Sequence, residues 1–296
     1  MIIKLKSNSQ YSKLYSPSYC MTITMNGQLL LTMLAEMLCE IPDSQFLMIN
    51  TDGLELKIPR EYEQLYYNIC KQWEAITKLE LEFDDYQKMI INNVNNYIAV
   101  TNKGKVKRKG AMFIHEIKDG ELEYHKDHSS LIIQKALEQY FVYNKDPKEY
   151  IFVESDIYDF FKRVKLKGNA KLVKRDVRLI PIETTGRSKK QKYEKIKIFE
   201  TELPKITRYY IAKSGYELVK ILPPLAGKID NRESYIEAGN NGNGELCMDC
   251  NVLNPLILND IQSNINYDWY YNKVMETITK IESNQEIEEN FESNES

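Results

Sequence analysis

The apolar residues in the first third of the chain recur with two different periods. Between residues 26 and 41, and again over 60–77, they return every three or four positions, which predicts two amphipathic helices. Between these segments, FLMI and LELKI flank the turn-forming tetrapeptide NTDG, a pattern typical of a β-hairpin. Short apolar runs at 79–83 and 96–100 predict strands. The order of helix, hairpin, helix, strand and strand predicts an α+β fold, because a doubly wound sheet alternates strands and helices regularly.

The second part of the chain opens with a basic turn and a strand, NKGKVKRKGAMF. Helical spacing returns over 131–143 and 147–163, and a last helix is expected over 266–281. Residues 181–198 contain proline, glycine and many lysines, which predicts an exposed loop or a flexible hairpin. A further strand is expected at 209–211. A chain of 296 residues accommodates two domains, each with its own core.

The composition, 43% apolar and 28% charged, is ordinary for a soluble globular protein. No run approaches the roughly 20 apolar residues that a membrane span needs. The N-terminal MIIKLKSNSQ lacks the apolar core of a signal peptide, so we expect a cytoplasmic protein with no membrane partner. Of the five cysteines, only Cys247 and Cys250 have the spacing of metal ligands, and no second pair accompanies them. A zinc site is therefore not favoured.

Charge is distributed unevenly, although the net charge is only −3. The last sixteen residues hold six glutamates and no lysine or arginine, which predicts a disordered acidic tail. Residues 160–198, the basic block, hold fourteen lysines and arginines against three acidic residues. Such a block is often only a solvated surface. This large positive surplus nevertheless fits a polyanionic partner better than a neutral one.

Asp52 is the strongest candidate for a metal ligand. It lies in the turn of the predicted hairpin, so two buried strands would hold its carboxylate rigidly while the oxygens face solvent. This position suits Mg²⁺, which takes few protein carboxylates and leaves room for substrate phosphates. Asp followed by Gly is also a common hairpin-turn pair that needs no function. The turn alone therefore leaves both interpretations open.

The N-terminal segment adds a second candidate group. Lys4, Asn8 and Tyr11 are spaced i, i+4 and i+7, which places them on one face of a predicted helix. A cation, an amide and an aromatic ring on one exposed face suit the phosphates, sugar and base of a nucleotide.

Together these segments resemble family B DNA polymerases, particularly the phage type. The family's fingers helix carries Lys, three residues, then Asn-Ser-x-Tyr-Gly, and KLKSNSQYS begins here at Lys4. The palm hairpin carries Asp-Thr-Asp-Ser, and NTDG stands here. The resemblance implies that Lys4 contacts the incoming triphosphate, and that Asn8 and Tyr11 shape the pocket around the nascent base pair. It implies that Asp52 binds the catalytic metals, two Mg²⁺ ions, with Thr51 beside it in the nucleotide site.

Further segments of the chain resemble the duplex-binding parts of the same family. VNNYIAV resembles the strand with a Lys-Lys-Arg-Tyr element, whose tyrosine matches Tyr97, and TRYYIAKSG and INYDWYY resemble phage polymerase palm and thumb. Val94, Asn95 and Asn96 stand where the family has basic residues, so nearby lysines would supply the charge. We therefore expect primer-template DNA to contact Tyr97, Lys103, Lys105, Lys107, Lys109, Lys189, Lys190, Thr207 and Arg208.

Three positions of the fingers and palm motifs depart from the family pattern. Asn50 replaces the first aspartate of the palm motif and removes one negative charge beside the metal site. Ser12 replaces a glycine and Gly53 replaces a serine, which alters local backbone freedom. Because Asp52 matches the ligand aspartate, the metal assignment is retained.

The other essential aspartate of the family lies on a palm strand upstream of the fingers helix, and this sequence starts three residues before Lys4. Two-metal phosphoryl transfer needs at least two carboxylates that bridge the ions, and neither Glu80 nor Glu82 matches the second one. We expect the chain to work beside an N-terminal polymerase half supplied in trans, as part of a split polymerase. Truncation of a longer gene fits the same residues.

The resulting prediction is the C-terminal part of a DNA-directed DNA polymerase that adds dNTPs to a primer 3′-hydroxyl. The alternative is a non-catalytic DNA-binding remnant of a polymerase, and a palm of the reverse-transcriptase kind is less favoured. The predicted domains are a fingers-helix remnant and connector over 1–25, a partial palm over 26–110, a helix-rich basic thumb over 111–280 and an acidic disordered tail over 281–296.

Overall fold

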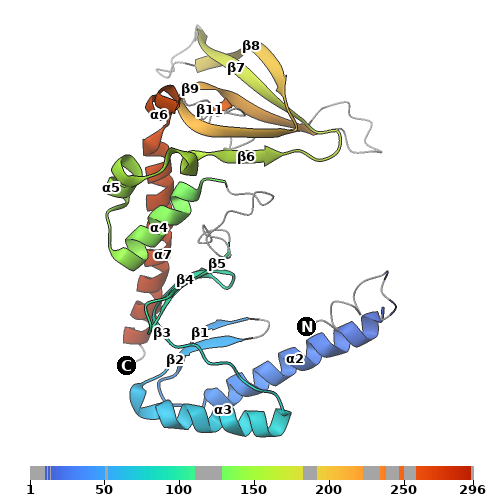
Figure 1. Ribbon diagram of the computed structural model, residues 1–296, viewed down its shortest axis with the longest axis vertical. Coiled ribbons are helices and arrows are strands. Elements are labelled where there is room, and N and C mark those ends of the chain that lie inside the picture. Colours follow the sequence, from blue (N-terminus) through green and yellow to red (C-terminus); the bar gives the residue numbers. More distant parts are fainter. Residues whose placement is uncertain are drawn as a thin grey trace. The chain divides into compact units, whose positions relative to one another are not determined.

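The computed structural model describes residues 11, 13, 15–50, 53–110, 129–182, 192–222, 234–237, 247–249 and 258–294. The chain divides into two compact units. Unit 1 is Met1–Asn95 with Ala99–Val106, and unit 2 is Asn96–Ile98 with Lys107–Ser296. Both units combine helices with antiparallel strands, which confirms the predicted α+β class (Figure 1).

Unit 1 is built on two packed helices and a hairpin. Their bounds are α2 (Pro17–Leu38), β1 (Gln45–Ile49), β2 (Leu54–Lys57), the 3-10 turn η1 (Arg60–Tyr62) and α3 (Glu63–Thr77). Ser16 caps the N-terminus of α2, because its Oγ accepts a hydrogen bond from the Tyr19 N–H at 3.4 Å, and Pro17 is the first residue of the helix. The predicted helices and hairpin are confirmed, and α2 starts nine residues before the predicted boundary at 26.

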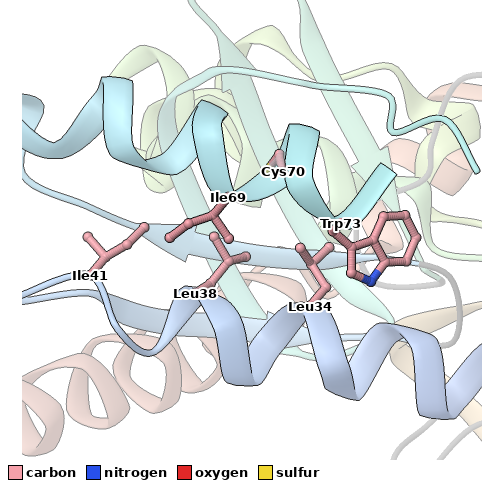
Figure 2. Packing of buried hydrophobic residues seen from close by; sticks show 6 residues of the cluster. All are labelled: Leu34, Leu38, Ile41, Ile69, Cys70 and Trp73. Carbon is pink, nitrogen blue, oxygen red and sulfur yellow. The ribbon is translucent and has the colours of Figure 1, made fainter. Parts of the chain in front are cut away.

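The core of unit 1 lies between the C-terminal half of α2 and α3 (Figure 2). Phe46, Leu54 and Leu56 of the hairpin pack against it. The Trp73 Nε1–H donates to the Leu30 carbonyl at 2.9 Å, so the indole satisfies its donor while its ring fills the core. The buried members of the cluster are Leu34, Leu38, Ile41, Ile69, Cys70 and Trp73.

The segment after α3 differs from the prediction. Residues 79–83 form no strand, because side chains of α3 hold this segment instead. The Leu81 N–H donates to Glu74 Oε1 at 2.7 Å, and the Phe83 ring meets the Tyr67 ring edge-on at 5.5 Å. The strands that follow are β3 (Tyr86–Asn93), β4 (Asn96–Thr101) and β5 (Val106–Lys109), in the order β3-β4-β5. The predicted strand at 96–100 is thereby confirmed.

The two longest helices of unit 2 among the described residues are α4 (Leu131–Tyr143) and α7 (Tyr267–Asn294), which pack against each other (Figure 1). Helix α4 has the predicted bounds. Helix α7 continues past the predicted end at 281, because Ile281 is fully buried and Glu282 accepts from the Tyr140 hydroxyl at 2.7 Å. The predicted helix end at 281 is thus corrected, and the disordered tail stays a prediction. The apolar stripe of α7 is Tyr270, Val274, Ile278 and Ile281.

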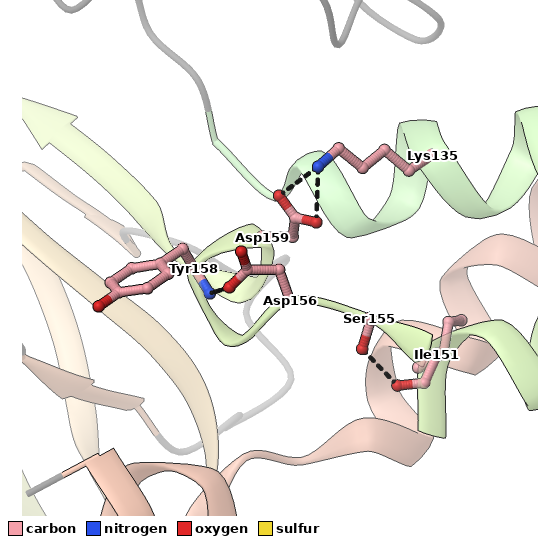
Figure 3. A network of polar contacts seen from close by, with 6 residues as sticks. All are labelled: Lys135, Ile151, Ser155, Asp156, Tyr158 and Asp159. Carbon is pink, nitrogen blue, oxygen red and sulfur yellow. Dashed lines mark hydrogen bonds and ion pairs between the residues drawn. The ribbon is translucent and has the colours of Figure 1, made fainter. Parts of the chain in front are cut away.

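The predicted helix over 147–163 is replaced by short turns and a strand. These are α5 (Pro147–Glu149), the π-helical turn η3 (Tyr150–Glu154), the 3-10 turn η4 (Ile157–Phe160) and β6 (Lys162–Lys165). The helical path is interrupted because Asp156 caps η4 by accepting from the Tyr158 N–H at 3.0 Å (Figure 3). Buried Asp159 accepts from Lys135 Nζ at 2.8 and 2.9 Å, which ties η4 to α4 (Figure 3).

Long antiparallel strands form the other layer of unit 2. They are β7 (Lys171–Ile182), β8 (Lys192–Leu203), β9 (Ile206–Leu222), β10 (Ser234–Glu237) and β11 (Cys247–Asp249); α6 (Leu258–Asn264) follows. The sheet order is β10-β9-β7-β8, and β6 and β11 also pair with β9. Glycine is required at Gly215, because a Cβ there would lie 2.3 Å from the Cys247 carbonyl oxygen. Within the described residues, no helix has the length and apolar character to cross a membrane.

Candidate nucleic-acid interface

The hairpin that carries the candidate metal ligand closes tightly. Ile49 pairs with Leu54, and the Asn50 N–H donates to the Gly53 carbonyl at 2.8 Å, so two residues lie between this last hydrogen-bonded pair. Those two residues, Thr51 and Asp52, lie outside the described residues. Within the described part of the chain, no group of three His, Cys, Asp or Glu side chains is arranged to hold a metal ion. The assignment of Asp52 as a Mg²⁺ ligand remains a prediction.

The N-terminal candidates are described only in part. Lys4 and Asn8 lie outside the described residues. Tyr11 is described, and its side chain is 96% exposed. A ring this open is accessible to a nucleotide base, and the grouping of Tyr11 with Lys4 and Asn8 stays a prediction.

Tyr97 and Lys109, by contrast, meet on neighbouring strands of unit 2. Lys109 Nζ lies 5.8 Å from the centroid of the Tyr97 ring. Side chains alternate along β5, so Lys107 and Lys109 point to one side and Arg108 to the other. Arg108 donates through Nε and Nη2 to the two oxygens of buried Glu138, each at 2.5 Å. Arg108 therefore belongs to a structural ion pair, and Lys107 and Lys109 lie together on the opposite side of β5.

The turn between β4 and β5 presents two further lysines. Lys103 and Lys105 are both exposed. Gly104 adopts φ 75°, and its N–H donates to the Thr101 carbonyl at 2.8 Å, while the Thr101 N–H donates to the Lys105 carbonyl at 2.9 Å. A tight turn with glycine in the left-handed region holds both cations at its tip.

Of the two duplex contacts predicted on β9, one side chain is buried and the other is half-buried. Thr207 has no exposed surface, and its hydroxyl donates to the Pro204 carbonyl at 2.8 Å. The prediction that Thr207 contacts DNA is therefore corrected, since its hydroxyl fixes the turn before β9. Arg208 is half-buried and stays a candidate. Lys189 and Lys190 lie outside the described residues.

Cross-strand glutamates neutralise part of the basic block. Arg175 on β7 contacts Glu200 on β8 at 3.1 Å, and Lys171 contacts Glu202 at 3.2 Å. Both pairs join residues on one side of the β7–β8 ladder. The sequence surplus of positive charge therefore overstates the charge that these two strands offer to a partner.

Sequence reasoning missed the arrangement around β6. Arg163 on β6 lies directly opposite Arg208 on β9. Its neighbour Lys162 lies on the other side of β6, with Nζ 4.4 Å from the centroid of the Trp269 ring. The basic block marked this region, but the pairing of Arg163 with Arg208 depends on strand register, which no local pattern gives.

Comparisons with known proteins give a loose likeness. No protein-family model matches the chain, and no curated protein matches it. Among solved structures, the chain is similar to the family B DNA polymerase from the hyperthermophilic archaeon Pyrobaculum calidifontis, with a TM-score of 0.43 and 12% sequence identity. The match covers 91% of this chain and 30% of that polymerase, so this chain spans less than a third of its length. A likeness at this level assigns no role to any residue.

Proposed function

We propose that this chain is the C-terminal part of a phage-type family B DNA-directed DNA polymerase. The observation that carries the proposal is the β1–β2 hairpin, which closes across Asn50 and Gly53. The family's metal-binding turn would stand at this position, between two short strands backed by a helical core. The order of the Lys4 motif, this hairpin and the Tyr97 strand along the chain supports the same family.

Basic side chains of the described residues support a duplex partner. Tyr97 with Lys109, the turn with Lys103 and Lys105, and Arg208 all lie on strands or tight turns rather than on long loops. Each of these elements holds its own cations on a rigid backbone, which suits contact with phosphate groups. Primer-template DNA is the polyanion that the polymerase proposal requires.

The proposed reaction is nucleotidyl transfer. The primer 3′-oxygen forms a bond to the α-phosphorus of a dNTP, the bond from that phosphorus to the pyrophosphate oxygen breaks, and pyrophosphate leaves. Mg²⁺ held by Asp52 and a second carboxylate would lower the pKa of the 3′-hydroxyl and stabilise the departing charge. Lys4 would neutralise the triphosphate, and Asn8 and Tyr11 would orient the base pair.

The second carboxylate comes from outside this sequence in this proposal. A preceding segment of the same polypeptide and a separate N-terminal half are both compatible with the chemistry. Leu47 and Ile49 on β1 are exposed apolar side chains, and β1 and β2 form a sheet of only two strands among the described residues. Both features support the proposal that another surface covers this hairpin.

Primer extension with matched aspartate variants tests the proposal. The chain would be expressed alone and together with the polypeptide encoded immediately upstream, and each preparation incubated with primer-template DNA, dNTPs and Mg²⁺. We expect extension only with the upstream polypeptide, and loss of about 10³-fold or more in Asp52→Asn with unchanged duplex affinity. Asp43→Asn is the control, because Asp43 is exposed and its φ of 55° suits asparagine equally well.

The alternative, a non-catalytic DNA-binding remnant, makes a different prediction in the same assay. It is favoured by Asn50, which removes a carboxylate from the motif. A complex that binds duplex DNA tightly and extends no primer would support the remnant and overturn the polymerase. Robust extension by the isolated chain would instead refute the need for a carboxylate from outside this sequence.

A further inference from the structure

The first half of α2 is uncharged, and the core of unit 1 does not cover it. Residues 17–35 include no Asp, Glu, Lys or Arg, and Glu36 is the first charged residue of the helix. All of residues 17–29 are exposed or half-buried, and packing of α2 on the core begins at Leu30. Exposed helix faces usually carry charge, as Lys71 of α3 and Lys280 of α7 do in this chain. The first half of α2 therefore has the composition of a buried helix.

Three large apolar side chains form a stripe along this half of α2. Met21, Met25 and Leu29 follow at intervals of four residues, so they share one helix face, and they are 64%, 51% and 64% exposed. Leu34, which points toward α3 (Figure 2), comes nine residues after Met25. Nine residues are two and a half turns, so the stripe faces away from α3. The α2–α3 core consequently leaves the stripe open.

Two threonines on the same face already have hydrogen-bond partners. The Thr22 hydroxyl donates to the Ser18 carbonyl at 3.0 Å, and the Thr32 hydroxyl donates to the Gln28 carbonyl at 2.9 Å. Thr22 comes three residues before Met25, and Thr32 comes three residues after Leu29, so both adjoin the stripe. A hydroxyl that is paired within its own helix can be covered without losing a hydrogen bond. Covering this face would mainly remove apolar side chains from water, which is favourable.

We propose that the stripe of Met21, Met25 and Leu29 is the docking surface for the polypeptide that supplies the second carboxylate. This inference rests on the proposed function, which requires such a polypeptide against unit 1. An uncharged face has no cation for a phosphate, so DNA does not fit it. The stripe is about 12 Å long, and side chains spaced four residues apart form a ridge that packs into the groove of another helix. The occupant is therefore an apolar protein surface.

The core of unit 1 connects this docking surface to the hairpin of the candidate metal ligand. Leu34 and Leu38 of α2 are buried in the cluster against which Phe46 and Leu54 of the hairpin pack. A polypeptide docked on α2 is thereby held at a defined place relative to the hairpin. Two-metal catalysis requires this, because the two ions lie only about 3.5–4 Å apart and carboxylates must bridge them.

Association of the full chain with the separately expressed polypeptide that is encoded immediately upstream tests the docking surface. Isothermal titration calorimetry gives the dissociation constant. We expect Met25→Glu to weaken association about a hundredfold, because docking would bury an unpaired charge. Val153→Glu is the control, since it adds the same charge at a side chain of unit 2 that is 78% exposed, and it should change the constant less than twofold. Circular dichroism of the isolated variants should match the wild type, because both side chains are exposed.

The possible results separate the docking surface from the catalytic proposal. Unchanged association of Met25→Glu, or no association of the wild-type chain, would overturn the docking surface. Self-association of the chain alone that Met25→Glu abolishes would assign the stripe to a second copy and would also overturn it. A complex that depends on Met25 but extends no primer would support the docking surface and overturn the polymerase activity. Primer extension by a complex that is indifferent to Met25→Glu would do the reverse.

Discussion

The strand pairs β1–β2 and β6–β9 are both antiparallel, but they are held in different ways. On β1–β2, Phe46 and Leu56 pack on the α2–α3 core, while Leu47 and Ile49 are exposed. The β6–β9 pair is connected to α7 and to the segment before α4 by hydrogen bonds from buried or half-buried groups. Apolar burial is non-directional, whereas hydrogen bonds fix register.

This difference separates two kinds of site. A hairpin with apolar side chains on both faces has further area that another surface can cover, which agrees with the proposal that chain outside this sequence completes this region. A strand pair fixed by its own unit can orient charged side chains without help. Under the proposed function, unit 2 is accordingly expected to bind DNA by itself, and unit 1 to need a further surface for catalysis.

The largest effect is expected in the core of unit 1, with two leucines of the same helix as a matched pair. Leu38 is fully buried between α2 and α3, and Leu29 is 64% exposed. Leu38→Ala should lower the free energy of unfolding by about 3 kcal/mol, because it leaves a cavity. Leu29→Ala should change it by less than about 0.5 kcal/mol.

Urea unfolding followed by tryptophan fluorescence measures this contrast in unit 1. A Trp269→Phe background leaves Trp73, which packs in the same core, as the reporter. If Leu29→Ala costs as much as Leu38→Ala, the N-terminal half of α2 is covered in solution.

A smaller effect is expected at the connection between β6 and β9. Tyr270→Phe keeps the ring that packs edge-on against Phe160 at 5.0 Å, but removes both hydroxyl contacts. It leaves the Ile211 N–H and the Phe160 carbonyl unpaired in a buried place, so we expect a loss of about 2 kcal/mol in unfolding free energy. Tyr143→Phe, at an exposed position on α4, is the control and should be neutral.

Circular dichroism during thermal unfolding measures the stability of both tyrosine variants. Equal stability of the two tyrosine variants would mean that the hydrogen bonds of Tyr270 do not hold the strand pair.

The smallest effect concerns alkaline pH and Tyr150 of η3. Burial, followed by the charge of nearby Asp159, raises the pKa of Tyr150 to about 12, above the 10.0 of an unperturbed tyrosine. A raised pKa in the folded state means that the contribution to stability is complete below pH 10 and is lost as pH rises from 10 toward 12. Tyr150→Phe should therefore lose less stability between pH 9 and pH 11 than the wild type. Parallel pH profiles in urea unfolding would contradict this.

The predictions made from the sequence succeeded where local pattern decides. Helix α4 occupies the predicted residues 131–143, and β1–β2 surrounds NTDG as the alternation of apolar and turn residues indicated. They failed where a distant side chain competes with the local pattern. Glu74 accepts a hydrogen bond from the Leu81 N–H, which holds residues 79–83 outside a sheet. The ion pair of Lys135 with Asp159 stabilises the turn η4, although the apolar spacing there is still that of a helix.

By itself, the sequence determined the α+β class, the positions of most helices and strands, the concentration of positive charge in the basic block and the motif around Asp52. Only the tertiary structure decided what individual polar and charged side chains do. It directs Arg108 to buried Glu138, buries Thr207, and sets Arg163 opposite Arg208. The physical reason is that strand register and burial are fixed by contacts between residues far apart in the chain, whereas periodicity and composition report only on near neighbours.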